Sequence, residues 1–532
     1  METGKRKILS NKVFLYMTEF FSGVCVMAVE QGASRLLAPY FSSSQIVWTI
    51  IIGMIMIAMA LGNIYGGRAV DKDPNPDRLY RRILVAAVWI ALIPLLGKYV
   101  ILGVSALMIV AVSTNLLIWA ALVSCLVIFV YPLFLLGTVT PSLIKYTVDD
   151  LNESGRIAGR LGAANTIGSI LGTFIPTFVT IPTAGTSATF LIFSGILLVL
   201  CIVYFASSKT GKKRVTAAVM LFLISCAFGH SDSFAFWDDD LTYEGESVYN
   251  YLQVKEDENT IALSTNVLFG VQSITMKDHS LSGMYYDYAM AAPLMADVNN
   301  KESCSILVLG NGTGTYATQC ERYFDNATAE GVEIDGKIIE LATEYFDQPA
   351  DMQVTEYDGR AYLNAVDKKY DVIMVDAFRD ITIPFQMSTV EFFTEVRDHL
   401  NEGGVMVVNL NMRGDENDPD DINHYLSDTI AAVFDHIYTV DVPDYTNRVL
   451  FATNASDALT VLTDNVAKED RSDLRTLMEN VGTQLQTYTP GSHVMTDDKA
   501  PVELLGMRQI DSIIREQVGY YRDLLLTGQL EL

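Results

Sequence analysis

The chain is 532 residues long, half of its residues are hydrophobic, and it still carries a formal net charge of −26 at pH 7. One ordinary globular core does not reach this length, so at least two domains are expected. The composition excludes a basic, aromatic-rich nucleic-acid-binding protein. Six scattered cysteines with no C-x-x-C pair, and six dispersed histidines, indicate neither a disulfide scaffold nor a zinc site, so we expect no metal.

The first part of the chain is predicted to be a helical membrane domain, residues 1–230. Residues 1–214 are apolar with an excess of Lys and Arg, whereas residues 215–532 are strongly acidic. Seven apolar segments are long enough to cross a bilayer, if the long third one is counted once. They are Val13–Val29, Val47–Tyr65, Ile83–Ser113, Leu116–Gly137, Leu161–Ile181, Ala188–Ala206 and Val215–Phe228.

Two features of these segments are open to more than one interpretation. Gly62-x-x-x-Gly66 and Gly168-x-x-x-Gly172 are spaced for close helix packing. Glu19, Glu30 and Arg35 lie in or near the first segment, where ionisable groups are costly and often functional. Glu30 and Arg35 either pair at the membrane interface or belong to a substrate path.

The acidic part is predicted to hold a small antiparallel β region at 237–302, an α/β domain at 303–460 and a helical extension at 461–532. Turn residues and alternating side chains suggest the first of these. After Ser303, strands alternate with helical segments such as Gly336–Tyr345 and Thr389–Leu400, a pattern typical of a parallel sheet. The expected strands are Ser305–Leu309, Thr328–Glu333, Gln353–Glu356, Asp371–Val375 and Val405–Asn409, with two late strands near Ile437–Val442 and Arg448–Ala452.

Candidate site residues follow four successive strands, where open α/β sheets bind ligands. The first strand runs into a glycine turn formed by Gly310, Gly312 and Gly314, which lets the backbone approach a ligand closely. Glu333 ends the second strand and can accept two ribose hydroxyls. Asp358-Gly359 follows the third strand, within reach of an adenine amino group, and Asp376 ends the fourth, facing the expected reacting carbon. Each carboxylate taken alone could instead cap a turn or a helix.

These motifs resemble spermidine synthase, and more closely the bacterial proteins that fuse a transporter-like membrane region to a spermidine-synthase-like domain. The matching residues are Glu246-Ser-Val-Tyr-Asn-Tyr-Leu-Gln-Val, Gly270-Val-Gln-Ser, Tyr285-Tyr-Asp-Tyr-Ala-Met, Gly310–Gly314, Val332-Glu-Ile-Asp, Asp358-Gly-Arg, Val375-Asp-Ala-Phe, Ile383-Pro-Phe and Thr496-Asp-Asp-Lys-Ala-Pro-Val-Glu, with Gly137-Thr-Val-Thr-Pro and Gly159-Arg-Leu-Gly-Ala-Ala-Asn-Thr-Ile-Gly in the membrane region. The resemblance implies a methyltransferase-like Rossmann fold with a small N-terminal β-sheet, and a homodimer.

The resemblance also implies an activity, namely aminopropyl transfer from decarboxylated S-adenosylmethionine to an amine. Gln272 would then contact the nucleoside, Glu333 the ribose and Asp358 the adenine, and Asp376 would be the catalytic aspartate. An amine is mostly protonated near pH 7, so a carboxylate must orient it and take its proton before it attacks. Tyr286 or Tyr288 would line the amine pocket, unless both serve core packing.

Two positions depart from the family pattern. Thr313 stands where spermidine synthases carry an acidic residue in the glycine loop, and Arg379 stands where they carry a second aspartate, with Asp380 next to it. Arginine suits a donor or acceptor that bears a carboxylate better than it suits a polyamine. Two other hypotheses therefore stay open: a methyl or alkyl transferase that uses S-adenosylmethionine itself, and a transporter with a nucleoside- or polyamine-sensing domain.

The side of the membrane on which the acidic region lies is not decided by the sequence. Basic residues cluster in alternate loops, which the positive-inside rule places in the cytoplasm. The clusters fall at residues 5–12, 68–82, 145–160 and 209–214. Seven crossings would then place the acidic region outside, whereas a cytosolic S-adenosyl nucleoside requires it inside.

Overall fold

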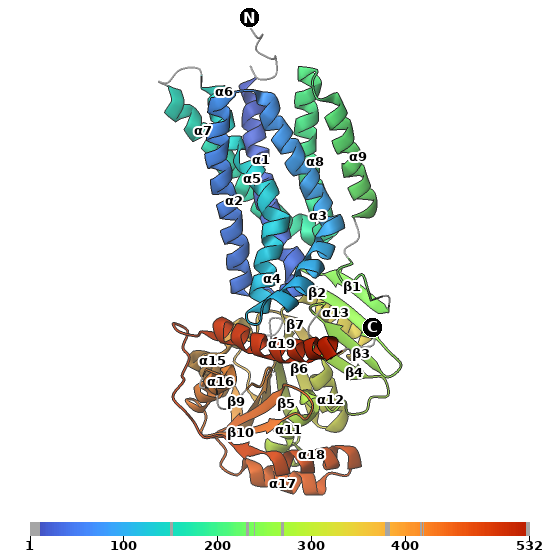
Figure 1. Cartoon of the computed structure of the whole chain (residues 1–532). Coiled ribbons are helices and arrows are strands. Elements are labelled where there is room, and N and C mark those ends of the chain that lie inside the picture. Colours follow the sequence, from blue (N-terminus) through green and yellow to red (C-terminus); the bar gives the residue numbers. More distant parts are fainter. Residues whose placement is uncertain are drawn as a thin grey trace, which may run out of the picture. The chain divides into compact units, whose positions relative to one another are not determined.

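The computed structural model describes residues 11–148, 153–229, 233–238, 240–267, 271–377, 383–414, 418 and 420–527. The chain forms two compact units (Figure 1). Unit 1 comprises the chain up to Asp238 together with Glu244–Tyr251, and unit 2 comprises Asp239–Tyr243 and the chain from Leu252 onward.

Unit 1 is helical, and five of its described helical segments are long and apolar enough to cross a membrane. They are α1 (Lys12–Phe41), α2 (Gln45–Lys72), α3 (Pro76–Ala111), Leu116–Thr147 and Ser154–Ser208. The fourth segment consists of α4 (Leu116–Cys125), the π-helical η1 (Leu126–Val130), α5 (Tyr131–Gly137) and α6 (Val139–Thr147). The fifth consists of α7 (Ser154–Ile175), the π-helical η3 (Pro176–Thr180) and α8 (Ile181–Ser208), and α9 (Lys212–Phe228) follows it.

The fifth segment is kinked. Gly185 has φ 84° and ψ 169°, which lies outside the helical region, so its 55 residues form two helices rather than one. α9 has 17 residues and is somewhat shorter than a typical membrane span of about 20 residues. The number of crossings therefore stays a prediction. The long third segment, whose sequence fits one long or two short helices, is a single helix.

Small residues allow the helices of unit 1 to pack closely. A side chain at Gly168 or Gly172 would collide with the α1 carbonyl oxygens of Phe20 and Val24. A side chain at Gly62 would collide in the same way with the carbonyl oxygen of Phe134 on α5. Both glycine motifs thus lie at backbone-to-backbone contacts between helices, where small residues are favoured.

Residues Glu244–Tyr251 belong to unit 1 because their carboxylates bond to it. Thr186 donates from its backbone N–H and its hydroxyl to Glu246, at 3.0 and 2.8 Å. Phe234 N–H donates to Glu244 at 2.7 Å, and Ala235 N–H donates to it at 2.9 Å. This segment lies within the range 237–302 that the sequence assigns to a β region.

The described strands form two sheets. The smaller has the order β1-β2-β3-β4, formed by β1 (Leu241–Glu246), β2 (Tyr251–Glu256), β3 (Thr260–Ser264) and β4 (Ser273–Met276). The larger has the order β12-β10-β11-β9-β8-β5-β6-β7. Its strands are β5 (Cys304–Leu309), β6 (Ala327–Glu333), β7 (Gln353–Glu356), β8 (Tyr370–Val375), β9 (Leu400–Leu410), β10 (His436–Asp441), β11 (Arg448–Thr453) and β12 (Gln486–Thr487).

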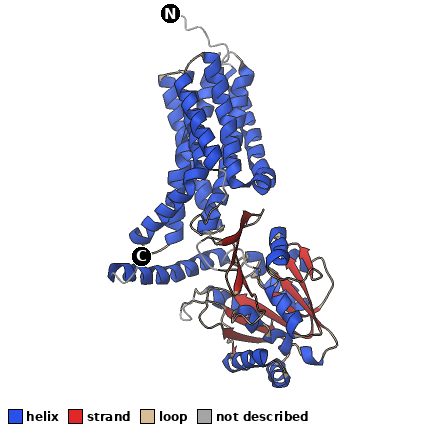
Figure 2. Ribbon diagram, turned by 90° about the vertical axis from the view of Figure 1, so that its right-hand side faces the viewer, coloured by secondary structure: helices blue, strands red, loops and turns tan. Residues whose placement is uncertain are grey.

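The larger sheet is parallel through β7, β6, β5, β8 and β9, and antiparallel through β11, β10 and β12. Successive residues of its central strands enter two different apolar cores, one on each face. The first core is covered by α11 (Ala291–Met295), α12 (Thr315–Tyr323), α17 (Ala458–Lys468) and α18 (Ser472–Gln484). The second is covered by α14 (Gly359–Leu363), α15 (Val390–Asp398), α16 (Ile422–Ala431) and α19 (Val502–Thr527), and Figure 2 shows the sheet between its helices.

The predicted fold class is confirmed, with a helical apolar region, a small sheet and a Rossmann-like sheet whose antiparallel edge is formed by late strands. The third predicted strand and α13 (Gly336–Tyr345) agree with the structure at both ends. β9 begins five residues before the predicted Val405. β12 pairs with β10, so the C-terminal segment contributes a short strand as well as helices.

Candidate functional site

The glycine turn after β5 brings the ends of three strands together. The N–H groups of Gly310 and Asn311 both donate to the carbonyl of Val332 on β6, at 2.9 and 3.0 Å. On the other side, the N–H of Asp376 donates to Leu309 at 2.9 Å. Gly310 has φ 83°, and a Cβ there would lie 2.5 Å from Ala377 Cα and 2.6 Å from the carbonyl oxygen of Asp376. Only glycine satisfies both conditions, so the turn and the end of β8 are fixed to each other.

The next residues of the turn lead into α12. Gly312 has φ 53° and Gly314 has φ 76°, and α12 begins at Thr315 directly after Gly314. The space beside Gly312 is open except for the Ser273 hydroxyl of β4, 3.5 Å from a Cβ placed there. Gln272 directly precedes β4, the strand whose Ser273 lies beside Gly312. The N–H of Gln272 donates to the carbonyl of Leu263 at 2.8 Å.

Glu333 is a buried carboxylate that closes the turn from the β6 side. Its Oε2 accepts the N–H of Gly312 at 2.9 Å, and its Oε1 accepts the N–H of Asp335 at 3.0 Å. Burial raises the pKa of Glu333, and these two backbone donors oppose the rise. Each carboxylate oxygen can accept a further hydrogen bond, so Glu333 keeps its capacity for a pair of ligand hydroxyls.

Asp358 is the N-cap of α14, and its Oδ1 accepts the N–H of Ala361 at 2.9 Å. Asp358 therefore does cap a helix, as one interpretation of the sequence held, and the cap occupies one of its two carboxylate oxygens. Gly359 packs against Leu309 and Met387, where an added Cβ would lie 3.3 Å from the Met387 methyl group. Both residues thus lie next to the end of β5.

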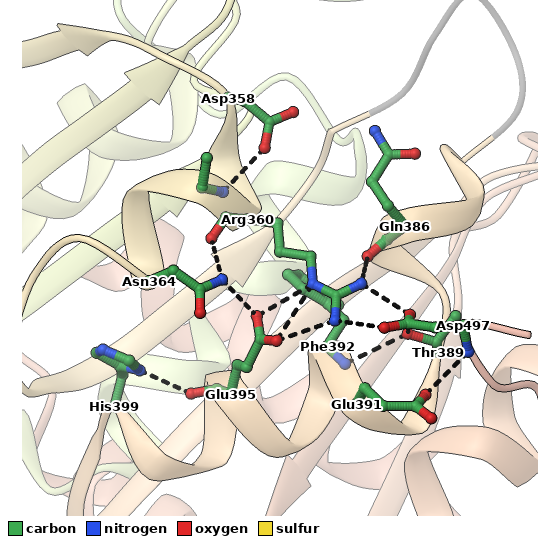
Figure 3. A network of polar contacts seen from close by, with 11 residues as sticks. Asp358, Arg360, Asn364, Gln386, Thr389, Glu391, Phe392, Glu395, His399 and Asp497 are labelled. Atoms are coloured by element: carbon green, nitrogen blue, oxygen red, sulfur yellow. Dashed lines mark hydrogen bonds and ion pairs between the residues drawn. The ribbon is translucent and has the colours of Figure 1, made fainter.

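Arg360, in the first turn of α14, bonds to three other segments of the chain (Figure 3). Its guanidinium donates to Asp497 through two bonds of 2.8 Å, to Glu395 at 2.9 and 3.1 Å, and to the carbonyl of Gln386 at 3.0 Å. Asp497 also accepts the Thr389 hydroxyl at 2.7 Å. Arg360 thereby connects the start of α14 to α15 and to the C-terminal Thr496-Asp-Asp-Lys motif.

Asp376 is held by two side chains, one on each carboxylate oxygen. The Tyr285 hydroxyl donates to Oδ2 at 2.5 Å, and the Asn409 amide donates to Oδ1 at 3.0 Å. Asn447 in turn donates to Asn409 at 2.9 Å, which fixes the orientation of that amide. Burial raises the pKa of Asp376 to about 7, the negative charge of Glu333 adds to the rise, and the two hydrogen bonds reduce it. A carboxylate tuned to this range can take a proton near neutral pH.

The three tyrosines of the Tyr285-Tyr-Asp-Tyr run have different environments. Tyr285 contacts Asp376, whereas the Tyr286 hydroxyl accepts the N–H of Ile274 on β4 at 2.8 Å. Tyr288 lies in the apolar core below α10 (Tyr285–Ala289). The sequence motif indicated a tyrosine at this site, but the tyrosine that donates to Asp376 is Tyr285. The sequence analysis did not identify Tyr285, Asn409 or Asn447 as site residues.

Of the two positions that depart from the family pattern, the structure describes Thr313 and does not describe Arg379. Thr313 is fully buried, and its hydroxyl lies 3.0 Å from that of Thr315, which lies 3.1 Å from that of Thr275. Arg379 and Asp380 lie outside the described residues, which resume at Ile383 after Ala377. Within the described part of the chain, no three His, Cys, Asp or Glu side chains are grouped to hold a metal ion.

The structure thus brings Gly310, Gly312, Gly314, Glu333 and Asp376 together around one turn. A nucleoside site fits these groups, because the turn offers a close backbone approach and Glu333 offers acceptors for hydroxyls. Asp376 lies at the neighbouring strand end with a pKa suited to proton transfer. Asp358 and Gly359 border the same strand ends, and Gln272 precedes the strand beside Gly312.

Known proteins are similar to this chain in its sequence. Residues 283–465 match the spermine/spermidine synthase domain. A probable polyamine aminopropyl transferase of Bifidobacterium longum is 51% identical over 341 residues, which cover 61% of this chain and 75% of that protein. A polyamine aminopropyltransferase of Oceanobacillus iheyensis is 23% identical over 432 residues, covering 76% of this chain and 78% of the relative. A Thermotoga maritima spermidine synthase structure covers 53% of this chain and 87% of its own, with 18% identity and a TM-score of 0.35.

Proposed function

This chain belongs to the polyamine aminopropyltransferase family, and from that premise we propose how unit 2 moves an aminopropyl group from decarboxylated S-adenosylmethionine to an amine. The proposal assigns Asp376 as the base and the glycine turn with Glu333 as the nucleoside site. Asp358 and Gln272 complete the nucleoside contacts, and Tyr286 lines the amine side next to Tyr285. One observation carries the assignment: Asp376 is a hydrogen-bonded carboxylate with a pKa of about 7 next to the Glu333 turn.

The reaction asks three things of these residues. Glu333 and the turn hold the nucleoside so that the aminopropyl carbon faces Asp376, and this alignment contributes much of the rate. Asp376 orients the amine and accepts its proton, which frees the nitrogen lone pair. The new N–C bond forms as the C–S bond breaks, and the bonding electrons stay on sulfur, which becomes a neutral thioether. The positive charge thereby passes from sulfur to the nitrogen of the new secondary ammonium, while the proton taken earlier from the amine stays on Asp376.

The test is Asp376→Asn in the full chain, because the amide has the shape of the acid and cannot take the proton. We expect a loss of about 10²- to 10⁴-fold in the rate of aminopropyl transfer. Methylthioadenosine should still raise the melting temperature, which shows that the nucleoside site is intact. Asp367→Asn, the same change at an exposed carboxylate, is the matched control and should transfer at the normal rate. Full activity of Asp376→Asn would refute the assignment.

Comparison of the two possible donors tests the donor assignment. Decarboxylated S-adenosylmethionine should support transfer to a diamine such as putrescine, and S-adenosylmethionine should not. Methyl transfer from S-adenosylmethionine at a comparable rate would instead favour the alkyl transferase hypothesis. A panel of diamines and triamines then identifies the acceptor.

We also propose that unit 1 anchors the enzyme in a membrane with its basic loops in the cytoplasm. The five long apolar segments support this, and so do the Lys and Arg residues in the helix ends that flank the α2–α3, α6–α7 and α8–α9 connections. Cysteine substitutions at Arg214 and at Asp367, labelled in intact cells by a membrane-impermeant maleimide, report the side of each. Labelling of the residue-214 cysteine from outside would refute the orientation. The residue-367 cysteine reports the side on which unit 2 works.

A further inference from the structure

Glu19 is a fully buried carboxylate inside the first apolar helix, and its two described partners are neutral. Its Oε1 accepts the Thr140 hydroxyl of α6 at 2.6 Å and the Asn165 amide of α7 at 3.1 Å. Its Oε2 is also buried, and no described group donates to it. A carboxylate without a counter-charge is expensive at membrane depth, so such groups are usually kept for a function.

Some charged and titratable groups of the surrounding helices are engaged with one another. Tyr80 of α3 is a near titratable group, and its hydroxyl lies 3.1 Å from that of Thr18, the residue before Glu19. Three ion pairs form between other residues of these helices and their connections, namely Lys145 with Asp71, Arg78 with Asp73, and Arg156 with Glu153. Tyr204 of α8 donates to Asp77. None of these described pairs brings a positive charge to Glu19.

The helix that supplies Thr140 has a local kink directly before it. α5 ends at Gly137 and α6 begins at Val139, with Thr138 between them. Thr138 keeps right-handed helical torsions, with φ −76° and ψ −6°. The hydroxyls of Thr138 and Ser142 donate to the carbonyls of Leu135 and Thr138, both at 2.7 Å. Pro141 accounts for the kink, because proline has no N–H to donate to the carbonyl of Gly137.

A polar seam continues from Glu19 along the contact of α1 and α7. Asn165, Ser169, Thr173 and Thr177 recur every four residues and so lie on one face of the helix. Ser169 faces Gly23 of α1, where an added Cβ would lie 3.2 Å from the serine oxygen, and Thr177 donates to Gln31 at 3.4 Å. Glu19 and Gln31 are separated by about 18 Å along α1. Hydroxyl and amide groups therefore follow more than half of a hydrocarbon thickness of about 30 Å.

We propose that Glu19, Thr140 and Asn165 form a binding site for a small monovalent cation in unit 1, with the polar groups of the α1–α7 contact beside it. The cation is a proton or a sodium ion, since both are neutralised by one carboxylate and are stabilised by hydroxyl and amide oxygens. Unit 1 then moves a cation across the membrane, an activity separate from the chemistry of unit 2. The alternative, a hydrogen bond that only joins three helices, predicts no dependence on any cation.

The test uses the full chain in proteoliposomes under an imposed membrane potential. One arm follows internal pH with a dye, and the other follows radioactive sodium, so the two arms identify the cation. We expect one of the two fluxes in the unaltered chain, and a loss of at least tenfold in Glu19→Gln. Glu153→Gln, the same change at an exposed carboxylate, should keep the flux. Aminopropyl transfer by unit 2 shows in the same samples that the variants are folded, and its outcome is independent of the flux. Equal fluxes of both cations in the unaltered chain and in Glu19→Gln would overturn the proposal.

Chemical modification provides a second measurement on the purified chain. A hydrophobic carbodiimide attaches to a buried carboxyl group, and mass spectrometry of the Glu19 peptide gives the rate. The rate should fall as pH rises if the ligand is a proton, or when sodium chloride replaces choline chloride if it is sodium. A rate that is indifferent to both changes contradicts a cation site.

Discussion

Replacing Tyr285 by Phe removes the shorter of the two hydrogen bonds to Asp376 and leaves the ring in place. The lost bond measures 2.5 Å and reaches a carboxylate from a buried hydroxyl. Hydrogen bonds to charged groups contribute about 1.5–3 kcal/mol, and the short distance favours the upper part of this range. At about 1.4 kcal/mol per pH unit, the change corresponds to about 2 pH units.

The sign follows from which form of Asp376 the bond stabilises. Tyr285 donates to the ionised form, so its loss makes the carboxylate less stable and raises the pKa of Asp376 above about 7. The base form is the active one. The acidic limb of the kcat/KM profile should therefore move to higher pH by about 2 pH units, with about 100-fold less activity on that limb. Activity should recover in part as pH rises.

The assay follows release of methylthioadenosine from decarboxylated S-adenosylmethionine with the detergent-purified full chain between pH 5 and 10, a range that spans about 3 pH units on the alkaline side of the native limb. Tyr316→Phe is the matched control, because it removes a buried tyrosine hydroxyl that bonds to the carbonyl of Ala289 instead. Its acidic limb should stay at the native position. A limb that does not move in Tyr285→Phe, or that moves to lower pH, would refute the role of Asp376 as the titrating base.

Three further substitutions test other parts of the site. Glu333→Gln removes a charge that raises the pKa of Asp376, so the acidic limb should shift to lower pH while the KM for the nucleoside donor rises, which a pH series at several donor concentrations measures. Gly310→Ala should weaken methylthioadenosine binding at least tenfold in calorimetry, whereas Gly403→Ala, with a similar φ of 75° and open space, should leave it unchanged. Arg360→Ala should lower the free energy of unfolding by about 3 kcal/mol in denaturant titrations that follow loss of activity. Arg397→Ala, which breaks an exposed pair with Asp398, should cost less than about 1 kcal/mol.

The sequence predicts which residues gather at the ends of the parallel strands, because strand, turn and helix are local patterns. A buried run that ends in Gly-Asn-Gly-Thr-Gly, and carboxylates directly after later runs, place Glu333 and Asp376 at neighbouring strand ends once the sheet is parallel. The same local patterns predicted the two late strands, which the structure pairs as an antiparallel edge.

The site residues that the sequence did not predict depend on the exact residue at which a helix begins and on pairing between distant strands. Which tyrosine of the run reaches Asp376 is set by the residue at which α10 begins, and a one-residue change of phase exchanges Tyr285 for Tyr286. Asn409 reaches Asp376 because β9 pairs with β8 in parallel register. Asn447 reaches Asn409 because β11 pairs with β9 in antiparallel register, which places the residue before β11 beside the end of β9. No local pattern marks either asparagine.

The path of the chain between the two units has a consequence for dividing the protein into separate parts. The backbone changes unit three times, after Asp238, after Tyr243 and after Tyr251, and β1 is divided between them. A single cut after Asp238 would leave the eight residues Glu244–Tyr251 with the wrong unit, and a cut after Tyr251 would leave the five residues Asp239–Tyr243 with the wrong unit. A cut after Tyr243 would misplace both segments. No single cut in this stretch therefore separates the two units cleanly.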